Sequence, residues 1–188
     1  MSDSPPPVSP FSTGHGGSRF ELLVASSYVL SLLDHYPARG LDRGEVVSVA
    51  LQQRNRGFLV DDVVIRGQED GRTYFLSLQI KHSLTFSDNA DFREILAVCW
   101  QQFTNGSFNP ESDKLGVGIS DASHITKVQS HLQELLTWAS SNTQHNAFFE
   151  TVAKFKQKNT FLQLFRSILK DCASRAVTDT EIWQFLKC

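Results

Sequence analysis

The sequence predicts an α/β domain in which a helix, three strands, a second helix and a fourth strand are followed by an all-helical extension. Two apolar, β-branched runs, at residues 58–65 and 73–80, are joined by a polar turn with glycine at both ends, which predicts a β-hairpin. Helical periodicity precedes and follows the strands. From residue 122 onward the pattern is helical only.

The chain has 188 residues, of which 40% are hydrophobic, so it can bury one sizeable core. Residues 1–17 are rich in Ser, Pro and Gly and predict a flexible tail. The α/β core is expected over 18–120 and the helical extension over 121–188. The extension should contain four helices, at residues 123–140, 146–155, 160–173 and 179–186.

The first helix is expected to start at Ser18 as its N-cap and to end before Pro37 and Gly40. Its apolar face should contain Phe20, Leu23, Val24, Ser27 and the run from Val29 to Leu33. Residues 45–52 follow as the first strand of the sheet.

After the hairpin, residues 89–103 predict a helix capped by Ser87 or Asp88, and residues 114–119 predict a short strand. The expected apolar face of this second helix consists of Phe92, Ile95, Leu96, Cys99, Trp100 and Phe103.

Polar side chains interrupt the apolar hairpin. Asp61 and Asp62 stand in the middle of its first run, and Gln79 and Lys81 end the second. Side chains alternate along a strand, so Gln79 and Lys81 should share a face, and only one aspartate can meet them. Either these groups form an edge-strand salt bridge with a snorkelling lysine, or a carboxylate and Gln79 hold a divalent cation while Lys81 faces a substrate.

An acidic residue followed one hairpin later by Gln79-Ile80-Lys81 resembles the PD-(D/E)XK nuclease core. The segments GSRFELLVASSYVLSLL, VDDVVI and LQIKHS, with Trp100, more narrowly resemble the double-stranded-DNA nuclease domain at the N-terminus of bacterial anti-phage proteins, and the resemblance covers roughly residues 16–120. Some of those proteins carry a cyclic-oligonucleotide sensor, as CBASS effectors do, and others a STAND-type NTPase. The resemblance implies a restriction-endonuclease-like αβββαβ fold and Mg²⁺-dependent (or Mn²⁺-dependent) cleavage of DNA.

The resemblance also implies roles for individual residues. The catalytic set would be Glu21, Asp62, Gln79 and Lys81. The metal ligands would be Asp62, Gln79, the Ile80 carbonyl and Glu21, with Asp61 as the alternative acid. A polar residue of the second helix, Gln101 or Gln102, can face such a site. Without the resemblance, Glu21 in the first helical turn is explained by the helix dipole alone.

A net charge of −2 excludes a globally basic DNA-binding surface. A local patch of Arg54, Arg56, Arg66 and Arg72 around the hairpin could contact DNA, and the same residues could equally be ordinary solvated cations. The three cysteines are widely spaced without a C-x-x-C pair, which favours a cytoplasmic bacterial protein with no disulfide framework. His124 and His131 have no companion Cys or Glu and are expected to be surface residues.

Two other functions fit the same residues. The chain could be a catalytically inactive relative that binds nucleic acid or a protein partner. It could also be a scaffold, if the phenylalanines of the helical half form an oligomer surface and not a core; these are Phe148, Phe149, Phe155, Phe161 and Phe165. A nuclease of this kind is expected to act as a homo-oligomer, because one site cuts one strand. Residues 178–187 resemble the start of a longer module, so a fused sensor or NTPase is expected beyond Cys188.

Overall fold

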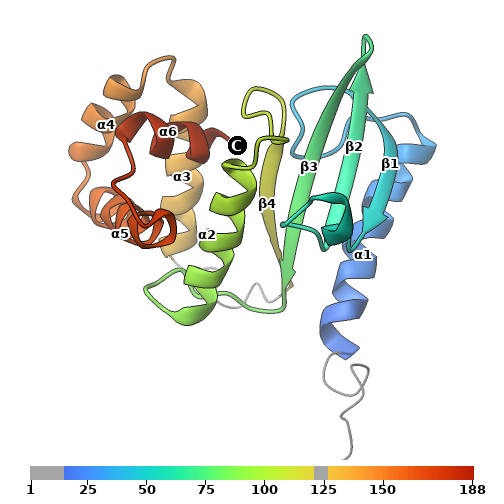
Figure 1. The fold of residues 1–188 in the computed structure, drawn as a ribbon, viewed down its shortest axis with the longest axis horizontal. Coiled ribbons are helices and arrows are strands. Elements are labelled where there is room, and N and C mark those ends of the chain that lie inside the picture. Colours follow the sequence, from blue (N-terminus) through green and yellow to red (C-terminus); the bar gives the residue numbers. More distant parts are fainter. Residues whose placement is uncertain (1–14, 121–126) are drawn as a thin grey trace, which may run out of the picture.

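The computed structural model describes residues 15–120 and 127–188, which form a mixed α/β structure around a four-stranded sheet (Figure 1). The strands lie in the order β1-β2-β3-β4; β1, β2 and β3 are antiparallel neighbours, and β4 runs parallel to β3. The strands are β1 (Glu45–Leu51), β2 (Val63–Glu69), β3 (Arg72–Lys81) and β4 (Lys114–Ile119). The helices are α1 (His15–Leu33), the 3-10 turn η2 (Arg54–Arg56), α2 (Ala90–Phe103), α3 (Lys127–Ser141), α4 (His145–Ala153), α5 (Lys156–Ala173) and α6 (Asp179–Lys187).

Helix α1 covers one face of the sheet, on the opposite side from the C-terminal helices (Figure 1). Ala25 is buried against the sheet, and Phe20, Val24, Tyr28 and Leu32 pack around the same core. The expected apolar face was therefore partly wrong. Leu23, Leu30 and Leu33 are exposed, because α1 is apolar around most of its circumference and only one side can meet the sheet.

Helix α2 covers the other face, where its predicted apolar residues are all buried. One continuous core joins α2 to β4 and to α3, α5 and α6. Phe148, Phe161 and Phe165 belong to this core, whereas Phe155 is exposed. The helical half is thus built around its phenylalanines, and most of them are not available as an oligomer surface.

The turn of the hairpin is shorter than expected. Strand β2 continues to Glu69, which pairs with Arg72, so only Asp70 and Gly71 form the turn. Both residues have positive φ, 50° and 75°, as in the two-residue turns whose twist matches that of paired strands. An Asp-Gly pair tolerates this conformation, so residues 67–69 can join the ladder.

The aspartate pair lies before β2 and not in the middle of a strand. Residues 58–62 are irregular, and β2 begins at Val63, opposite Leu78 of β3. The cause is a side chain that replaces a backbone partner: the backbone N–H of Ile80 donates to Asp62 Oδ2 at 2.6 Å. The apolar residues before the aspartates do not form a strand; Val60 is buried instead in the core that includes the buried side of α2.

Helix boundaries shift by a few residues. Helix α1 already includes residues 15–17, which were assigned to the tail, and so Ser18 is not its N-cap. The N-cap of α2 is Asn89, whose side chain accepts from the Phe92 N–H at 2.9 Å, and not Ser87 or Asp88. Helix α5 starts at Lys156, one polar turn earlier than predicted. Residues 121–126, including His124, lie outside the described residues.

All three cysteines are free, and Cys99 is buried, as predicted. Within residues 15–120 and 127–188, no helix is both long and apolar enough to cross a membrane.

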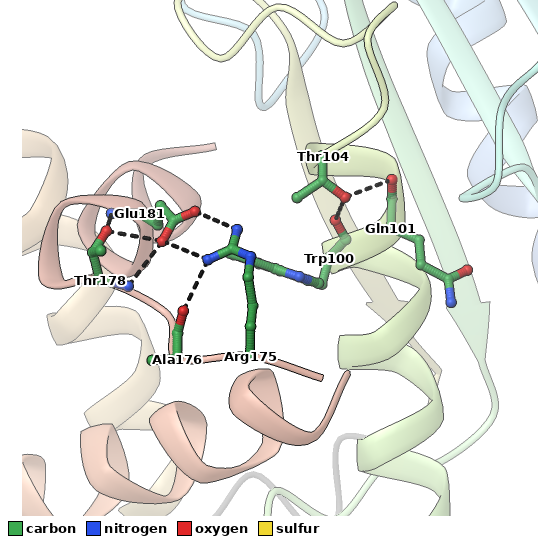
Figure 2. Close-up of polar contacts among 7 residues, drawn as sticks. All are labelled: Trp100, Gln101, Thr104, Arg175, Ala176, Thr178 and Glu181. Carbon is green, nitrogen blue, oxygen red and sulfur yellow. Dashed lines mark hydrogen bonds and ion pairs between the residues drawn. The ribbon is translucent and has the colours of Figure 1, made fainter. Parts of the chain in front are cut away.

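Helix α6 is fixed at its first turn by a capping box and an ion pair. Thr178 caps the Glu181 N–H, and the Glu181 side chain accepts in return from the Thr178 N–H at 2.8 Å. Arg175 donates to both Glu181 carboxylate oxygens, at 2.6 and 3.1 Å, and to the Ala176 carbonyl (Figure 2). The Arg175 hydrogen bonds, followed by those from Thr178, lower the Glu181 pKa from 4.5 to about 2.

This lowered pKa predicts acid sensitivity. Because the folded-state pKa lies below the unfolded value, the stabilisation is present above about pH 4.5 and is lost as the pH falls toward 2. Glu181→Gln should lower the free energy of unfolding at pH 7 by about 1 kcal/mol and flatten its decline between pH 5 and 2.5. Urea denaturation across this range measures both effects. Glu150→Gln, at an exposed position of α4, is the matched control, and equal pH profiles for the two variants would contradict the assignment.

Candidate active site at the paired ends of strands β2 and β3

Strand pairing brings Asp62 into contact with Gln79. Val63 pairs with Leu78, so Asp62, one residue earlier, lies across from Gln79. Gln79 Nε2 donates to Asp62 Oδ2, which also accepts the Ile80 N–H. Of the two aspartates, Asp62 is therefore the one that meets the Gln79-Ile80-Lys81 segment.

Gln79 and Lys81 share a face of β3, as alternation requires, and line one small pocket. The pocket has a volume of about 50 Å³ and is closed on its other side by helix α2. Its remaining lining residues are Arg54, Glu94, Ile95 and Val98. The Gln79 amide and the Lys81 ammonium of β3 thus line the same pocket as Arg54 of η2 and Glu94 of α2.

Asp61 points to a different partner. Its Oδ1 lies 3.7 Å from Arg54 Nε, and its side chain is only 14% exposed. Arg54 comes from the short η2 turn, whose left-handed end at Gly57 directs the chain back toward the aspartates. Asp61 therefore positions Arg54 at the rim of the pocket.

Glu21 reaches the same region from the second turn of α1, and not from the first as predicted, because α1 already begins at His15. Burial raises the pKa of Glu21, and the negative charges of Asp62 and then Asp61 raise it further. Within the described residues, no hydrogen bond joins Glu21 to either aspartate. Glu21 is therefore close enough to both aspartates to be repelled by their charges, although it shares no hydrogen bond with them.

Burial also raises the pKa of Asp62, against the lowering effect of the hydrogen bond from the Ile80 N–H. The charge of Asp61 raises it further, and the cations Lys81 and Arg54 lower it. Net repulsion among these partly buried acids favours either a proton or a bound cation at this position.

The donor atoms near Asp62 suit a hard cation. The carboxylate of Asp62 and the amide oxygen of Gln79 are oxygen ligands, and the Ile80 carbonyl points to the same strand edge as its N–H, which meets Asp62. Gln79 presents Nε2 to Asp62, so its amide must rotate to offer oxygen. In residues 15–120 and 127–188, no three His, Cys, Asp or Glu side chains are placed to hold a metal together, and Glu21 is thus not grouped with the aspartates as a ligand.

The predicted arginine patch is dispersed. Arg54 lines the pocket, while Arg56 and Arg66 are exposed and do not line it. Arg72 begins β3 and Lys81 ends it, which separates the two by about 30 Å in an extended strand. Only Arg54 of the four therefore belongs to the site.

Sequence reasoning missed Glu94 and misplaced the glutamines of α2. Glu94 lines the pocket one turn into α2. The available signal in the sequence was its spacing of four residues from Val98, which places both side chains on the same side of the helix. Gln102 is buried and its Oε1 accepts from the Leu59 N–H at 2.5 Å, so it braces the segment before the aspartates. Gln101 is exposed. His131 lines a separate pocket with Asp88 and Lys156.

A second pair of polar side chains closes the ends of β3 and β4. His82 Nδ1 lies 2.7 Å from Ser120 Oγ, and the Ser120 hydroxyl donates to the His82 carbonyl at 3.0 Å. With its proton engaged there, the serine is not activated by the histidine, which makes this contact a structural one.

No protein-family model, curated protein or solved structure matches this chain.

The electrostatic coupling of the acids is directly measurable. Asp62→Asn keeps an acceptor for the Ile80 N–H but removes a charge, so the Glu21 pKa should fall in metal-free buffer while staying above its usual value because burial persists. Carbon-13 NMR titration of the glutamate carboxyl groups measures this shift. Glu69→Gln, at the far end of β2, should leave it unchanged. An unaltered Glu21 pKa in Asp62→Asn would contradict the coupling.

Proposed function

We propose that this chain is a metal-dependent DNA endonuclease with a restriction-endonuclease-like core. The observation that carries the proposal is the contact of Asp62 with Gln79 and the Ile80 N–H, with Lys81 on the same face of β3. The order α1, β1-β2-β3, α2, β4 and the parallel placement of β4 beside β3 support the same fold.

The metal would be held by Asp62, the Gln79 amide oxygen and the Ile80 carbonyl. When bound, Mg²⁺ or Mn²⁺ lowers the pKa of a coordinated water and offsets phosphate charge. With only one carboxylate among these ligands, binding is weak, and the nearby acids Glu21 and Asp61 strengthen it through charge.

The remaining residues bind and orient the DNA. Lys81 holds the attacking water and stabilises the negative charge that develops on the phosphate. Arg54, with its side chain 67% exposed and anchored by Asp61, contacts a backbone phosphate next to the cleaved bond. Such contacts carry no base information, so cleavage has little sequence preference.

The biological setting follows from the resemblance alone. It supports an effector of bacterial anti-phage defence that acts on double-stranded DNA in the cytoplasm.

The second candidate is a binding protein of the same fold that cleaves nothing. Two observations favour it: Gln79 replaces an acid, and the described residues contain no cluster of three acidic, His or Cys ligands. Plasmid nicking with Mg²⁺ or Mn²⁺, compared with EDTA, separates the two. Metal-dependent nicking supports the nuclease, and a metal-independent gel shift without nicking supports the binder.

Lys81 should be essential for cleavage and dispensable for folding. Lys81→Ala should reduce the nicking rate by at least about 100-fold, because it removes stabilisation of the transition-state charge. Its thermal unfolding should match that of the wild type. Lys170→Ala, an exposed lysine at the end of α5, is the control for general loss of positive charge. Retained cleavage by Lys81→Ala with Mg²⁺ present would remove the assignment.

The two aspartates should differ in their effect on cleavage. Asp62→Ala should be inactive, because it deletes the carboxylate that contacts the Gln79-Ile80-Lys81 segment. Asp61→Ala should keep measurable activity with weaker DNA binding, since Asp61 positions Arg54. Nicking rates and filter binding on the same preparations measure both. An active Asp62→Ala protein beside an inactive Asp61→Ala protein would reverse the roles.

A further inference from the structure

Helix α1 exposes a row of large apolar side chains, here called the α1 stripe. Leu22, Leu23, Leu30 and Leu33 are 55–69% exposed, and Val29 is 40% exposed. The α1 stripe consists of these five residues and Ser26, which is also exposed.

The α1 stripe is contiguous. At 100° per residue, its six members lie within about 120° of the helix circumference, on the side away from the buried Ala25 and the partly buried Val24 and Tyr28. Figure 1 shows α1 at the outer side of the sheet, away from α2 to α6. Single exposed leucines are common, but a continuous apolar row of this length is typical of an interaction surface.

Four apolar members of the stripe are placed symmetrically about Ser26, whereas Leu33, seven residues after Ser26, has Arg19 as its counterpart. Leu22 and Leu30 each lie four residues from Ser26, and Leu23 and Val29 each lie three residues away. A second α1 packed antiparallel, with a twofold axis at Ser26, would set Leu22 against Leu30 of the other copy, and Leu23 against Val29. A self-complementary patch of this kind is what a symmetric dimer requires.

Ser26 suits the centre of such a contact. It is small, which allows close approach of two helices, and its hydroxyl donates to the Leu22 carbonyl of its own helix at 2.7 Å. Its hydrogen-bonding need is therefore met without the partner, and burial of the hydroxyl leaves no unsatisfied group.

The charges at the two ends are complementary. Arg19 lies seven residues before Ser26 and Asp34 eight residues after it, about 10 and 12 Å along the helix axis. Both side chains are exposed, and within the described residues neither has an ion-pair partner. In the antiparallel pair, Arg19 of each copy meets Asp34 of the other, twice by symmetry.

We propose that the α1 stripe is a homodimer interface, in which a second copy of this chain packs its α1 antiparallel about a twofold axis at Ser26. Glu21 lies on the opposite side of α1, toward Asp61 and Asp62, so the dimer leaves the candidate active site open. The inference rests on α1 alone and holds whether or not the chain cleaves DNA.

Sedimentation velocity of the full chain between 1 and 200 µM tests the dimer. A contact formed by one helix from each copy should be weak, with a dissociation constant on the order of micromolar. Leu30→Glu should remain monomeric throughout this range with an unchanged circular dichroism spectrum, while Leu136→Glu, at an exposed apolar position of α3, should dimerise as the wild type does. A monomeric wild type at 200 µM would overturn the proposal, whichever other segment or partner covers the stripe.

Charge reversal tests the antiparallel geometry and does not depend on apolar burial. Arg19→Glu and Asp34→Arg should each weaken dimerisation by at least about tenfold, because each creates two like-charge contacts. The double variant, which restores opposite charges across the interface, should recover most of the lost affinity. A double variant as weak as the sum of the single changes would reject this arrangement.

Disulfide trapping locates the symmetry axis. Ser26→Cys places two thiols face to face, so mild oxidation should yield a covalent dimer on a non-reducing gel. Ser140→Cys, at an exposed position of α3, and the wild type, with its three native thiols, control for random linkage. Linkage no faster for Ser26→Cys than for Ser140→Cys would place the axis elsewhere and overturn the proposal.

Discussion

The register of β2 against β3 is the constraint on which the rest of the site depends. The two-residue turn at Asp70 and Gly71 sets Glu69 opposite Arg72, and every later pair follows from that one. Six pairs further along, Val63 meets Leu78, and Asp62 arrives opposite Gln79. A slip of one residue would turn Gln79 and Lys81 to the α1 face and bury them among apolar side chains. The hydrophobic core therefore enforces the position of the polar cluster.

The same cluster is held together against electrostatic repulsion. Glu21, Asp61 and Asp62 come from two separate segments, and their mutual charge raises the pKa of Glu21 and Asp62 beyond the effect of burial. Two cations oppose this: Arg54 beside Asp61, and Lys81 beside Asp62. A folded protein tolerates such repulsion only when other contacts hold the acidic side chains in place. Here the Ile80 N–H and the Gln102–Leu59 hydrogen bond provide that support.

Helix α1 carries the α1 stripe on the side opposite to the candidate active site. Its inner side packs on the sheet and contributes Glu21, while its outer side carries the α1 stripe. Because the two sides are about half a turn apart, a contact made on the outside can steady the helix without covering Glu21. The C-terminal helices serve a different purpose: their aromatic residues join α2 into one core and so fix the wall of the pocket that bears Glu94.

The sequence by itself determined the order of the elements, the buried face of α2, the shared face of Gln79 and Lys81, and the strand at residues 114–119. These features are local, since periodicity within a single segment sets them. The tertiary structure alone decided four others. It chose which side of the mostly apolar α1 is buried. It used Asp62 as the partner of the Ile80 N–H, so that β2 begins only at Val63. It left only Arg54 of the four arginines at the pocket, and it brought Glu94 there. Each depends on segments distant in sequence competing for the same surface, which no pattern within one segment records.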